Sequence, residues 1–359
     1  MSQEFKQLDF TGKDIFVGID VHLKQWTITV RFQRMEMATH SIDPDPAVLM
    51  KYLHRRYPKG NYHSVYEAGF CGFWIHRQLS SFGFKNIVVN PADVPTTHKE
   101  KDRKTDRIDS RKLARELESR SLKGGIYIPS EYHQQLRSLS RLRRRLVQEQ
   151  TRIKSRIKGY LHYTGIQLPA HSEMSHWSGH FLKWLGSLEF SEPMGADYLD
   201  ICLNSLENVR HQLADTIRRL KRYSYQLELK DLIHTYLCSI PGISFITAIT
   251  LYCELMDMKR FPNLDHLKSL LGFVPSVDSS DERRKEKGLT HRRNAYLRYI
   301  LIEAAWVAVR KDPAMSLAFA ELTKRMSKQN AIIRIAKKLL NRIRYVWLNQ
   351  TTYHIGTIQ

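Results

Sequence analysis

The order of strand and helix patterns in the first 120 residues constrains the fold of this chain most strongly. Apolar or alternating runs rich in β-branched residues are typical of strands, whereas apolar residues three and four positions apart are typical of helices. By these criteria we predict strands at 14–20, 26–32, 35–42, 62–69 and 86–90, and helices at 46–56, at 71–82 and from 104 onward. The predicted order is βββαβαβα, an α/β domain that begins with a three-stranded meander.

The chain is strongly basic. Lys and Arg number 57 against 36 Asp and Glu, which gives a formal net charge of +21. Such an excess indicates a partner rich in phosphate, and nucleic acid is the first expectation. A ribosome-associated or merely basic protein is the alternative.

Cysteine spacing and hydropathy indicate a protein that stays inside the cell. The four cysteines are far apart, form no CxxC pair and have no His at zinc-ligand spacing. No apolar run is long enough for a membrane span, and the N-terminus MSQEFKQLDF lacks an apolar signal core. We expect a cytoplasmic protein, associated with the nucleoid, with reduced cysteines and no membrane partner.

Two heptad patterns predict a long coiled-coil middle. The first consists of Leu139, Leu146, Ile153 and Tyr160, and the second of Leu199, Leu206, Leu213, Leu220 and Leu227. The two helices either pair antiparallel or meet their equivalents in another subunit. Residues 137–158 carry nine Arg or Lys and one acid, Glu149. This ridge is either a solvated face or, as we favour because like charges repel, a surface for a polyanion. The segment 163–197 is expected to be a hairpin tip or small insertion.

The last third is expected to be mostly helical. The turn Pro241–Gly242–Ile243 between two helical patterns is similar to helix-hairpin-helix modules, whose backbone N–H groups bind phosphate; a plain helix–helix turn is the alternative. Residues 276–290 are expected to form an exposed loop or hairpin, followed by a helix, with a basic helix near 328–348. The predicted domains are 1–128, 129–229 and 230–359.

Acidic residues follow two of the predicted strands. A meander followed by αβαβα is the order of a ribonuclease-H-like fold, in which the first and fourth strands are neighbours in the sheet. Asp20 and Glu67 end these two strands, where burial of a carboxylate is costly unless a cation or hydrogen bonds compensate it. The two side chains are therefore expected to lie side by side.

Two further acids begin the helix at 104–114. Asp106 and Asp109 are three positions apart and so share a helix face. Taken alone, Asp106 is interpreted as an N-cap and Asp109 as a favourable first-turn acid. Together with Asp20 and Glu67 they instead suit two Mg²⁺ ions, with Mn²⁺ as a substitute, acting on a phosphodiester. Asp102 competes for one of these roles but lies in a basic loop.

Six segments, in the same order from about residue 14 to 310, resemble the DEDD-type insertion-sequence transposases related to the Piv invertases, a group that uses a structured bridge RNA. They are VGIDVHLK, YEAGFCGFWIHRQL, KTDRIDSRKLA, IPGISFITAITLYCEL, RFPNLDHLKSLLGFVPSVDSS and HRRNAYLRYILIEAAW. The resemblance implies a RuvC-like N-terminal domain with the tetrad Asp20, Glu67, Asp106 and Asp109, a coiled-coil middle and a C-terminal domain with a nucleophilic serine. That serine normally precedes Gly, which points to Ser280; because Asp281 replaces the Gly, Ser279 stays open.

The resemblance implies an RNA-guided transposase that cuts and rejoins DNA. A serine hydroxyl activated by the metal site would form a phosphoserine–DNA intermediate that conserves the bond energy for rejoining. Donor and target DNA, the RNA, and a dimer or tetramer of the chain are the expected partners. The expected nucleic-acid contacts are Lys104, Arg107, Arg141, Arg144, Arg145, Arg152, Lys154, Arg156, Gly242, Arg283, Arg284, Arg292 and Arg293. A metal-dependent junction resolvase without serine chemistry, or a non-enzymatic nucleic-acid-binding protein, are the rivals.

Overall fold

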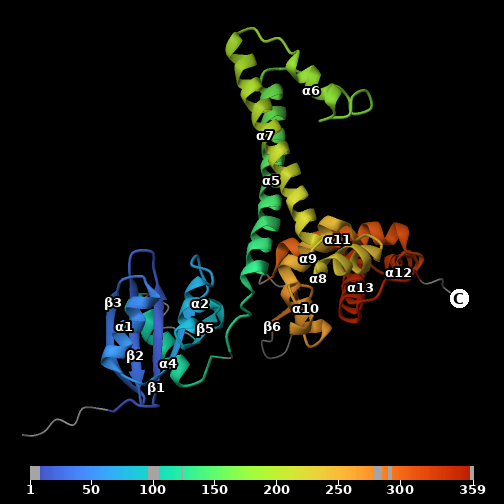
Figure 1. The fold of residues 1–359 in the computed structure, drawn as a ribbon. Coiled ribbons are helices and arrows are strands. Elements are labelled where there is room, and N and C mark those ends of the chain that lie inside the picture. The colour runs from blue at the N-terminus through green and yellow to red at the C-terminus, as the bar shows by residue number, and fades with distance from the viewer. Residues whose placement is uncertain (1–8, 96–104, 123, 279–284, 290–292, 356–359) are drawn as a thin grey trace, which may run out of the picture. The chain divides into compact units, whose positions relative to one another are not determined.

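The computed structural model describes residues 9–95, 105–122, 124–278, 285–289 and 293–355 (Figure 1). The chain divides into two compact units, residues 1–128 and 129–359. The first is a mixed α/β unit built on one sheet, and the second is mostly helical. Among the described residues, no helix is both long and apolar enough to cross a lipid bilayer.

The first unit contains a five-stranded sheet of order β3-β2-β1-β4-β5. Its strands are β1 (Asp14–Val21), β2 (Trp26–Phe32), β3 (Met35–Ile42), β4 (Asn61–Glu67) and β5 (Lys85–Val89). The first three form an antiparallel meander, and β4 pairs in parallel with both β1 and β5. The predicted meander and the predicted neighbourhood of the first and fourth strands are confirmed, as a RuvC-like DEDD domain requires.

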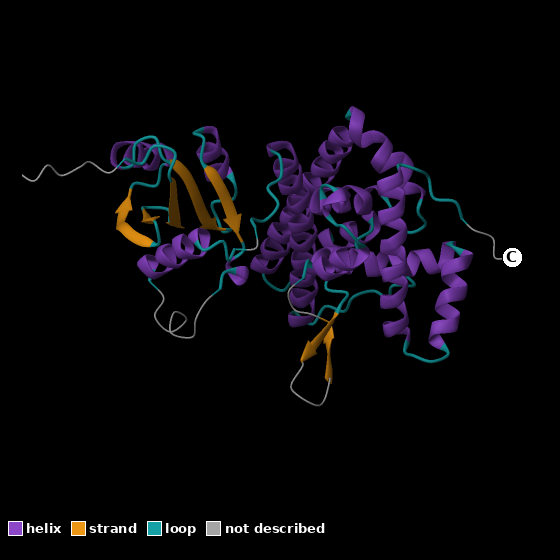
Figure 2. Cartoon of the chain, turned by 90° about the horizontal axis from the view of Figure 1, so that it is seen from below, coloured by secondary structure: helices purple, strands orange, loops and turns teal. Residues whose placement is uncertain are grey.

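Helices cover both faces of this sheet (Figure 2). On one face, α1 (Pro46–Arg56) and α2 (Trp74–Ser81) pack against Ile15, Val17 and Ile19, which are fully buried. On the other face, α4 (Asp106–Glu118) packs through Leu113 against Val65 and Val89, and a short 3-10 turn, η1 (Pro91–Asp93), follows β5. Because both faces are covered, β1 is a nearly continuous apolar run up to Asp20, and the end of β4 is buried up to Glu67.

The backbone of α4 touches the backbone of β1 at Gly18. A Cβ atom on Gly18 would lie 2.2 Å from the Ser110 carbonyl oxygen and 2.4 Å from the Ala114 nitrogen. The same helix is tied to β2 by a buried hydrogen bond of 2.9 Å between the hydroxyls of Thr29 and Ser110. These contacts fix the distance between α4 and the end of β1, where Asp20 lies.

In the second unit, two long helices run side by side in opposite directions: α5 (Glu131–Tyr163) and α7 (Pro193–Ser224) (Figure 1). Four of the expected heptad residues are fully or almost fully buried along this pair: Ile153, Leu199, Leu206 and Leu220. The heptad of α7 was expected to continue to Leu227, and this is wrong, because α7 ends at Ser224 and Leu227 begins the separate helix α8 (Leu227–Lys230). Between the long helices, α6 (Gly179–Gly186) closes a small core with Phe181 and Leu185, so the segment 163–197 carries a short helix of its own.

The rest of the second unit is a helical core. It contains α9 (Phe245–Leu255), η4 (Met258–Arg260), α10 (Leu264–Leu271), α11 (Ala295–Lys311), α12 (Pro313–Thr323) and α13 (Lys328–Asn349). The strands β6 (Pro275–Asp278) and β7 (Lys285–Leu289) pair antiparallel, so the hairpin expected within 276–290 is confirmed. The helix expected before the Pro241–Gly242 turn is irregular, because a π-helical turn η2 (Asp231–Tyr236) and a 3-10 turn η3 (Leu237–Ser239) take its place.

Candidate active site

Asp20 and Glu67 are neighbours at the same edge of the sheet. The parallel register pairs Ile19 of β1 with Tyr66 of β4, and the two acids follow at the next position of each strand. Because side chains alternate along a strand, Asp20 lies on the same face as Gly18, which is the face covered by α4. The sheet therefore places the carboxylates of Asp20 and Glu67 beneath the first turn of that helix.

The first turn of α4 is capped by Thr105, whose hydroxyl accepts a hydrogen bond of 3.3 Å from the Ile108 N–H. The interpretation of Asp106 as the N-cap is therefore wrong: Asp106 is the first residue of the helix, and its side chain does not perform the capping. Asp109 follows on the same helix face, with 17% of its side chain exposed. The threonine thus leaves both carboxylates available for other contacts.

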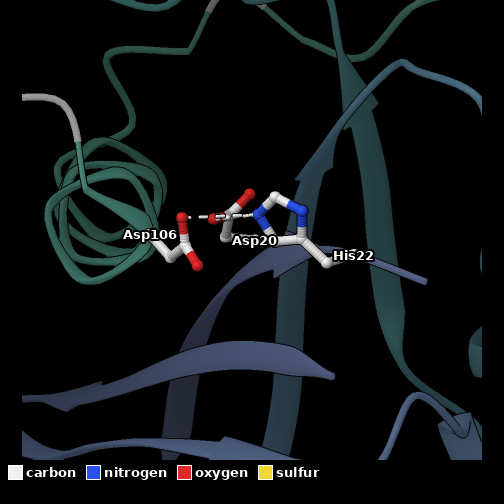
Figure 3. Close-up of side chains that lie close together, drawn as sticks. All are labelled: Asp20, His22 and Asp106. Carbon is white, nitrogen blue, oxygen red and sulfur yellow. Dashed lines mark hydrogen bonds and ion pairs between the residues drawn. The ribbon is translucent and has the colours of Figure 1, made fainter. Parts of the chain in front are cut away.

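Asp20 and Asp106 converge on the imidazole of His22 (Figure 3). The His22 Nε2 atom lies 3.2 Å from Asp20 Oδ2 and 3.4 Å from Asp106 Oδ1. One ligand atom from each of the three residues lies within 4.8 Å of the other two. The cluster combines two carboxylates and one imidazole from β1, the residues after it and α4.

Burial raises the pKa of Asp20 above its ordinary value. The negative charges of Asp106 and Asp109 raise this pKa further, whereas the His22 imidazole opposes the rise. Ionised Asp20 therefore costs the folded protein free energy, because partial burial and like charges both disfavour the anion. A cation among these oxygens would offset that cost.

Glu67 and Asp109 share a different cation. The Lys112 Nζ atom lies 3.9 Å from Glu67 Oε1 and 3.5 Å from Asp109 Oδ1. Lys112 is only 6% exposed, which is unusual for lysine and is tolerated here because two carboxylates lie beside its ammonium group. Of the four acids of the expected tetrad, Asp20 and Asp106 thus lie beside the His22 imidazole, and Glu67 and Asp109 lie beside the Lys112 ammonium group.

Sequence reasoning missed His22 and Lys112. Both were within quoted segments, VGIDVHLK and KTDRIDSRKLA, and their spacing gave a signal: His22 is two residues after Asp20, and Lys112 is three residues after Asp109. Two residues along a strand, or three along a helix, return a side chain to the same face. The helical period that relates Asp106 to Asp109 therefore also relates Asp109 to Lys112, and the strand period relates Asp20 to His22.

The residues present fit a divalent cation. Carboxylate oxygens are the ligands that Mg²⁺ prefers, and an added imidazole nitrogen suits Mn²⁺ and other transition metals better than Mg²⁺. Burial, and then the neighbouring charges of Asp106 and Asp109, raise the pKa of Asp20, and a bound cation would offset both effects. Asp20 and Asp106 would be the first ligands, and His22 lies beside them. Glu67 and Asp109 would be further ligands, and both lie beside Lys112.

Several expected residues lie outside the described part of the chain. These are Asp102, Lys104, Ser279, Ser280, Arg283, Arg284 and Arg292. Arg293 is described and exposed, and its side chain packs over Gly272 at the end of α10. Arg107 is exposed on the first turn of α4, beside the acids.

The cations of the basic ridge of α5 differ in whether they have a partner elsewhere in the fold. Arg141 donates two hydrogen bonds, of 2.7 and 2.8 Å, to the carboxylate of Glu254 on α9, whose side chain is 5% exposed. Lys154 lies over the Trp177 ring, 5.3 Å from its centre. Arg145, Arg152 and Arg156 are exposed. Arg141 thus has a packing function that its place in a charged run did not reveal, since such bidentate pairs bind strongly.

Gly242 adopts a φ of +91°, and a Cβ atom there would lie 2.3 Å from the Ala304 carbonyl oxygen of α11. The turn therefore requires glycine for its left-handed backbone and for its close approach to a neighbouring helix. This reason is sufficient without a bound phosphate. A hollow beside the turn is lined by Ser244, Thr247 and the acidic Glu303.

Comparison with known proteins gives matches over both units. A family model described as a transposase, the DEDD domain of IS110 elements, matches residues 17–165, and the model of the transposase IS116/IS110/IS902 family matches residues 234–320. A putative transposase of Sinorhizobium fredii, y4rJ, is 26% identical over 91% of this chain and 90% of its own length.

Two further relatives are similar. The transposase for insertion sequence element IS1533 of Leptospira borgpetersenii is 23% identical over 92% of this chain and 96% of its own length. A second putative transposase of Sinorhizobium fredii, y4qE, is 29% identical over 67% of this chain, and the chain spans only 57% of that relative. The match to the DEDD model includes Asp20, Glu67, Asp106 and Asp109.

Proposed function

The chain belongs to the IS116/IS110/IS902 family of insertion-sequence transposases, and on that premise we propose that the edge of its sheet is a Mg²⁺-dependent centre for DNA strand cleavage and rejoining. The observation that carries this proposal is the convergence of Asp20, His22 and Asp106, with their ligand atoms within 4.8 Å of one another. A DEDD transposase domain implies a divalent metal, and the family implies an enzyme that acts on DNA.

In this proposal the chain's own residues perform three tasks. Asp20, Glu67, Asp106 and Asp109 hold one or two divalent ions, which supply Lewis-acid stabilisation of the phosphodiester when bound. Lys112 holds the carboxylates of Glu67 and Asp109 in place through its ammonium group. Gly18 and Thr105 position α4 so that its two aspartates face the strand ends.

The nucleophile of this proposal is the Ser280 hydroxyl, with Ser279 as the alternative. Its oxygen forms a bond to the DNA phosphorus, its proton passes to a base, and the bond between phosphorus and the leaving sugar oxygen breaks. The resulting phosphoserine keeps the energy of the broken bond, so that a second DNA hydroxyl can reverse the step without ATP. Arg283, Arg284, Arg292 and Arg293 would hold neighbouring phosphates.

Recognition of donor and target DNA is assigned in this proposal to a structured RNA, with the chain acting as a dimer or tetramer. Support comes from the exposed Arg145 and Arg156 on α5, which can contact phosphate irrespective of sequence. The junction-resolvase rival shares the metal centre but not the serine. The non-enzymatic rival requires neither.

Metal removal tests the proposed centre directly. We expect the full chain, with its RNA and a plasmid substrate, to cut DNA in Mg²⁺ or Mn²⁺ and to lose essentially all cleavage after chelation. Mg²⁺ should also raise the melting temperature, because a ligand that binds only the folded state stabilises it. Cleavage that survives chelation, or a melting temperature indifferent to Mg²⁺ and Mn²⁺, would contradict the proposal and favour the non-enzymatic rival.

His22 should determine which metal the centre prefers. Since imidazole nitrogen favours Mn²⁺ over Mg²⁺, we expect His22→Gln to weaken Mn²⁺ binding by about 10-fold or more, the lower end for loss of a metal-site partner, and to change Mg²⁺ binding much less. Calorimetric titration of each metal measures this ratio without reliance on activity.

The matched control for this titration is His63→Gln. His63 contacts Asp14, at 3.1 Å, at the opposite end of β1, and its loss should leave both metal affinities unchanged. An unchanged ratio of Mn²⁺ to Mg²⁺ affinity in His22→Gln would show that His22 is only a hydrogen-bonding neighbour of the acids.

A further inference from the structure

A basic hollow with aromatic walls lies between α5 and α11 in the second unit. Its volume is about 760 Å³, within the roughly 300–1,000 Å³ typical of small-ligand sites. Arg143, Arg144 and Arg152 contribute from α5, and Tyr296, Tyr299 and Ile300 from α11. The acids of the metal centre belong to the other unit, and none of them lines this hollow.

The charge of the hollow favours an anion. Three arginines line it, and the described residues of its lining include no Asp or Glu. The only carboxylate near any of the three in the described chain is that of Glu149, 3.8 Å from Arg152, and both side chains of this pair are exposed, so the pair is weak. Closely spaced guanidinium groups bind phosphate and carboxylate groups through bidentate hydrogen bonds.

Arg143 provides a second, independent indication. Its Nε atom is buried and has no hydrogen-bond partner among the described residues. A buried donor without a partner is unfavourable, because its N–H group has lost water without gaining an acceptor. Reorientation of Arg143 toward a phosphate in the hollow would give that N–H group an acceptor.

The aromatic walls favour a planar group beside the phosphate. Tyr296 and Tyr299 are three residues apart on α11 and so share a helix face. The Arg144 guanidinium already lies over the Tyr296 ring, 4.1 Å from its centre. Tyr299 is 59% exposed, so its ring can accept a stacked partner.

We propose that this hollow binds an unpaired nucleotide, with its base stacked on Tyr299 and its phosphates held by Arg143, Arg144 and Arg152. Aromatic rings combined with a basic groove are the means by which proteins bind single strands irrespective of sequence, since every base has a face to stack. In a duplex both faces of a base are already stacked. The inference rests on the proposed function only in that the chain acts on nucleic acid, and the strand can be RNA or DNA.

Binding of short single strands to the full chain tests this inference. We expect Tyr299→Leu to weaken binding of fluorescent oligouridylate or oligothymidylate of about ten nucleotides by roughly 5- to 100-fold, the range for loss of one base–aromatic stack. A duplex of the same length should bind with an affinity changed less than about twofold by the same substitution. Fluorescence anisotropy measures each Kd, and the two oligonucleotides decide between RNA and DNA.

Two variants separate stacking from general effects. Tyr345→Leu removes another exposed tyrosine, 62% exposed on α13, and should change no affinity. Tyr299→Phe keeps the ring and should bind single strands like the wild type. Photo-crosslinking of 4-thiouridine or 4-thiothymidine in the same oligonucleotides should identify Tyr299 or its neighbours on α11 by mass spectrometry.

The outcomes distinguish this hollow from the metal centre. Equal losses for single strands and duplex, or equal behaviour of the Tyr299 and Tyr345 variants, would overturn the inference even where the wild type cuts DNA. If the affinity for oligonucleotides does not depend on Tyr299, and an acidic peptide binds to the arginines of the hollow instead, the inference is wrong and the hollow binds a protein partner. A selective loss with Tyr299→Leu would support the hollow even where the wild type shows no metal-dependent cleavage.

Discussion

Asp20→Asn should lower the rate of DNA strand cleavage by roughly a hundredfold to a thousandfold or more, the range for loss of a preorganised electrostatic group at a reacting centre. The substitution keeps the shape of the side chain and an oxygen that can accept a hydrogen bond from His22, but removes the charge needed to bind a cation. Cleavage of a plasmid substrate at saturating Mg²⁺ measures the effect.

The same variant should not lose stability at neutral pH. Because the folded-state pKa of Asp20 lies above its unfolded value, its contribution to stability is fully present below the unfolded pKa and is lost as pH rises through the folded pKa. In metal-free buffer at neutral pH, Asp20→Asn should therefore melt at the wild-type temperature or above it. The rise in melting temperature that Mg²⁺ gives the wild type should disappear.

Asp14→Asn is the matched control on the same strand. A hydrogen bond from His63 lowers the pKa of Asp14, so its stabilising contribution is present above its unfolded pKa and is lost as pH falls through the folded pKa. This variant should keep full cleavage and the response to Mg²⁺. Normal cleavage by Asp20→Asn, or an equal loss in both variants, would exclude Asp20 as a metal ligand.

Ser280→Ala should abolish the covalent protein–DNA adduct and lower joined product by roughly a thousandfold or more, because removal of a covalent nucleophile leaves only the residual rate from binding and electrostatics. Ser279→Ala is its matched control and should retain both. Mass spectrometry of protein trapped on cut DNA should find the nucleotide on residue 280.

Other outcomes of this comparison assign the chemistry differently. Loss of the adduct in Ser279→Ala alone would transfer the role to Ser279, consistent with Asp281 at the position of the usual Gly. Metal-dependent cutting that persists in both variants without an adduct would support the junction-resolvase rival.

Local patterns predicted the strands and helices of the first unit well. The boundaries expected at 26–32, 35–42 and 46–56 coincide with β2, β3 and α1, because each has a clear period and a clear turn at its ends. The adjacency of Asp20 and Glu67 was also predictable, since it follows from strand order alone. Whether the four acids bind metal stays a prediction.

Features that depend on distant partners were not predictable. Arg141 is exposed like its neighbours on α5, and only the fold brings Glu254, 113 residues further along the chain, to its guanidinium. Gly242 looked like a phosphate-binding turn, whereas its contact with Ala304 gives it a packing reason. By residue type Asp106 was the better cap, but the helix begins at Asp106 and Thr105 caps it, because the path of the backbone decides the position.

The contact of α4 with Gly18 implies that the proposed metal centre can be inactivated without loss of any acid. Exchange of one hydrogen for a methyl group there would meet main-chain atoms, which cannot rotate aside as a side chain can, so the whole helix would have to lift away from the strand. A chain with Ala at this position would keep every acid of the site and yet hold α4 away from the end of the strand. We therefore expect activity to require this glycine in addition to the aspartates.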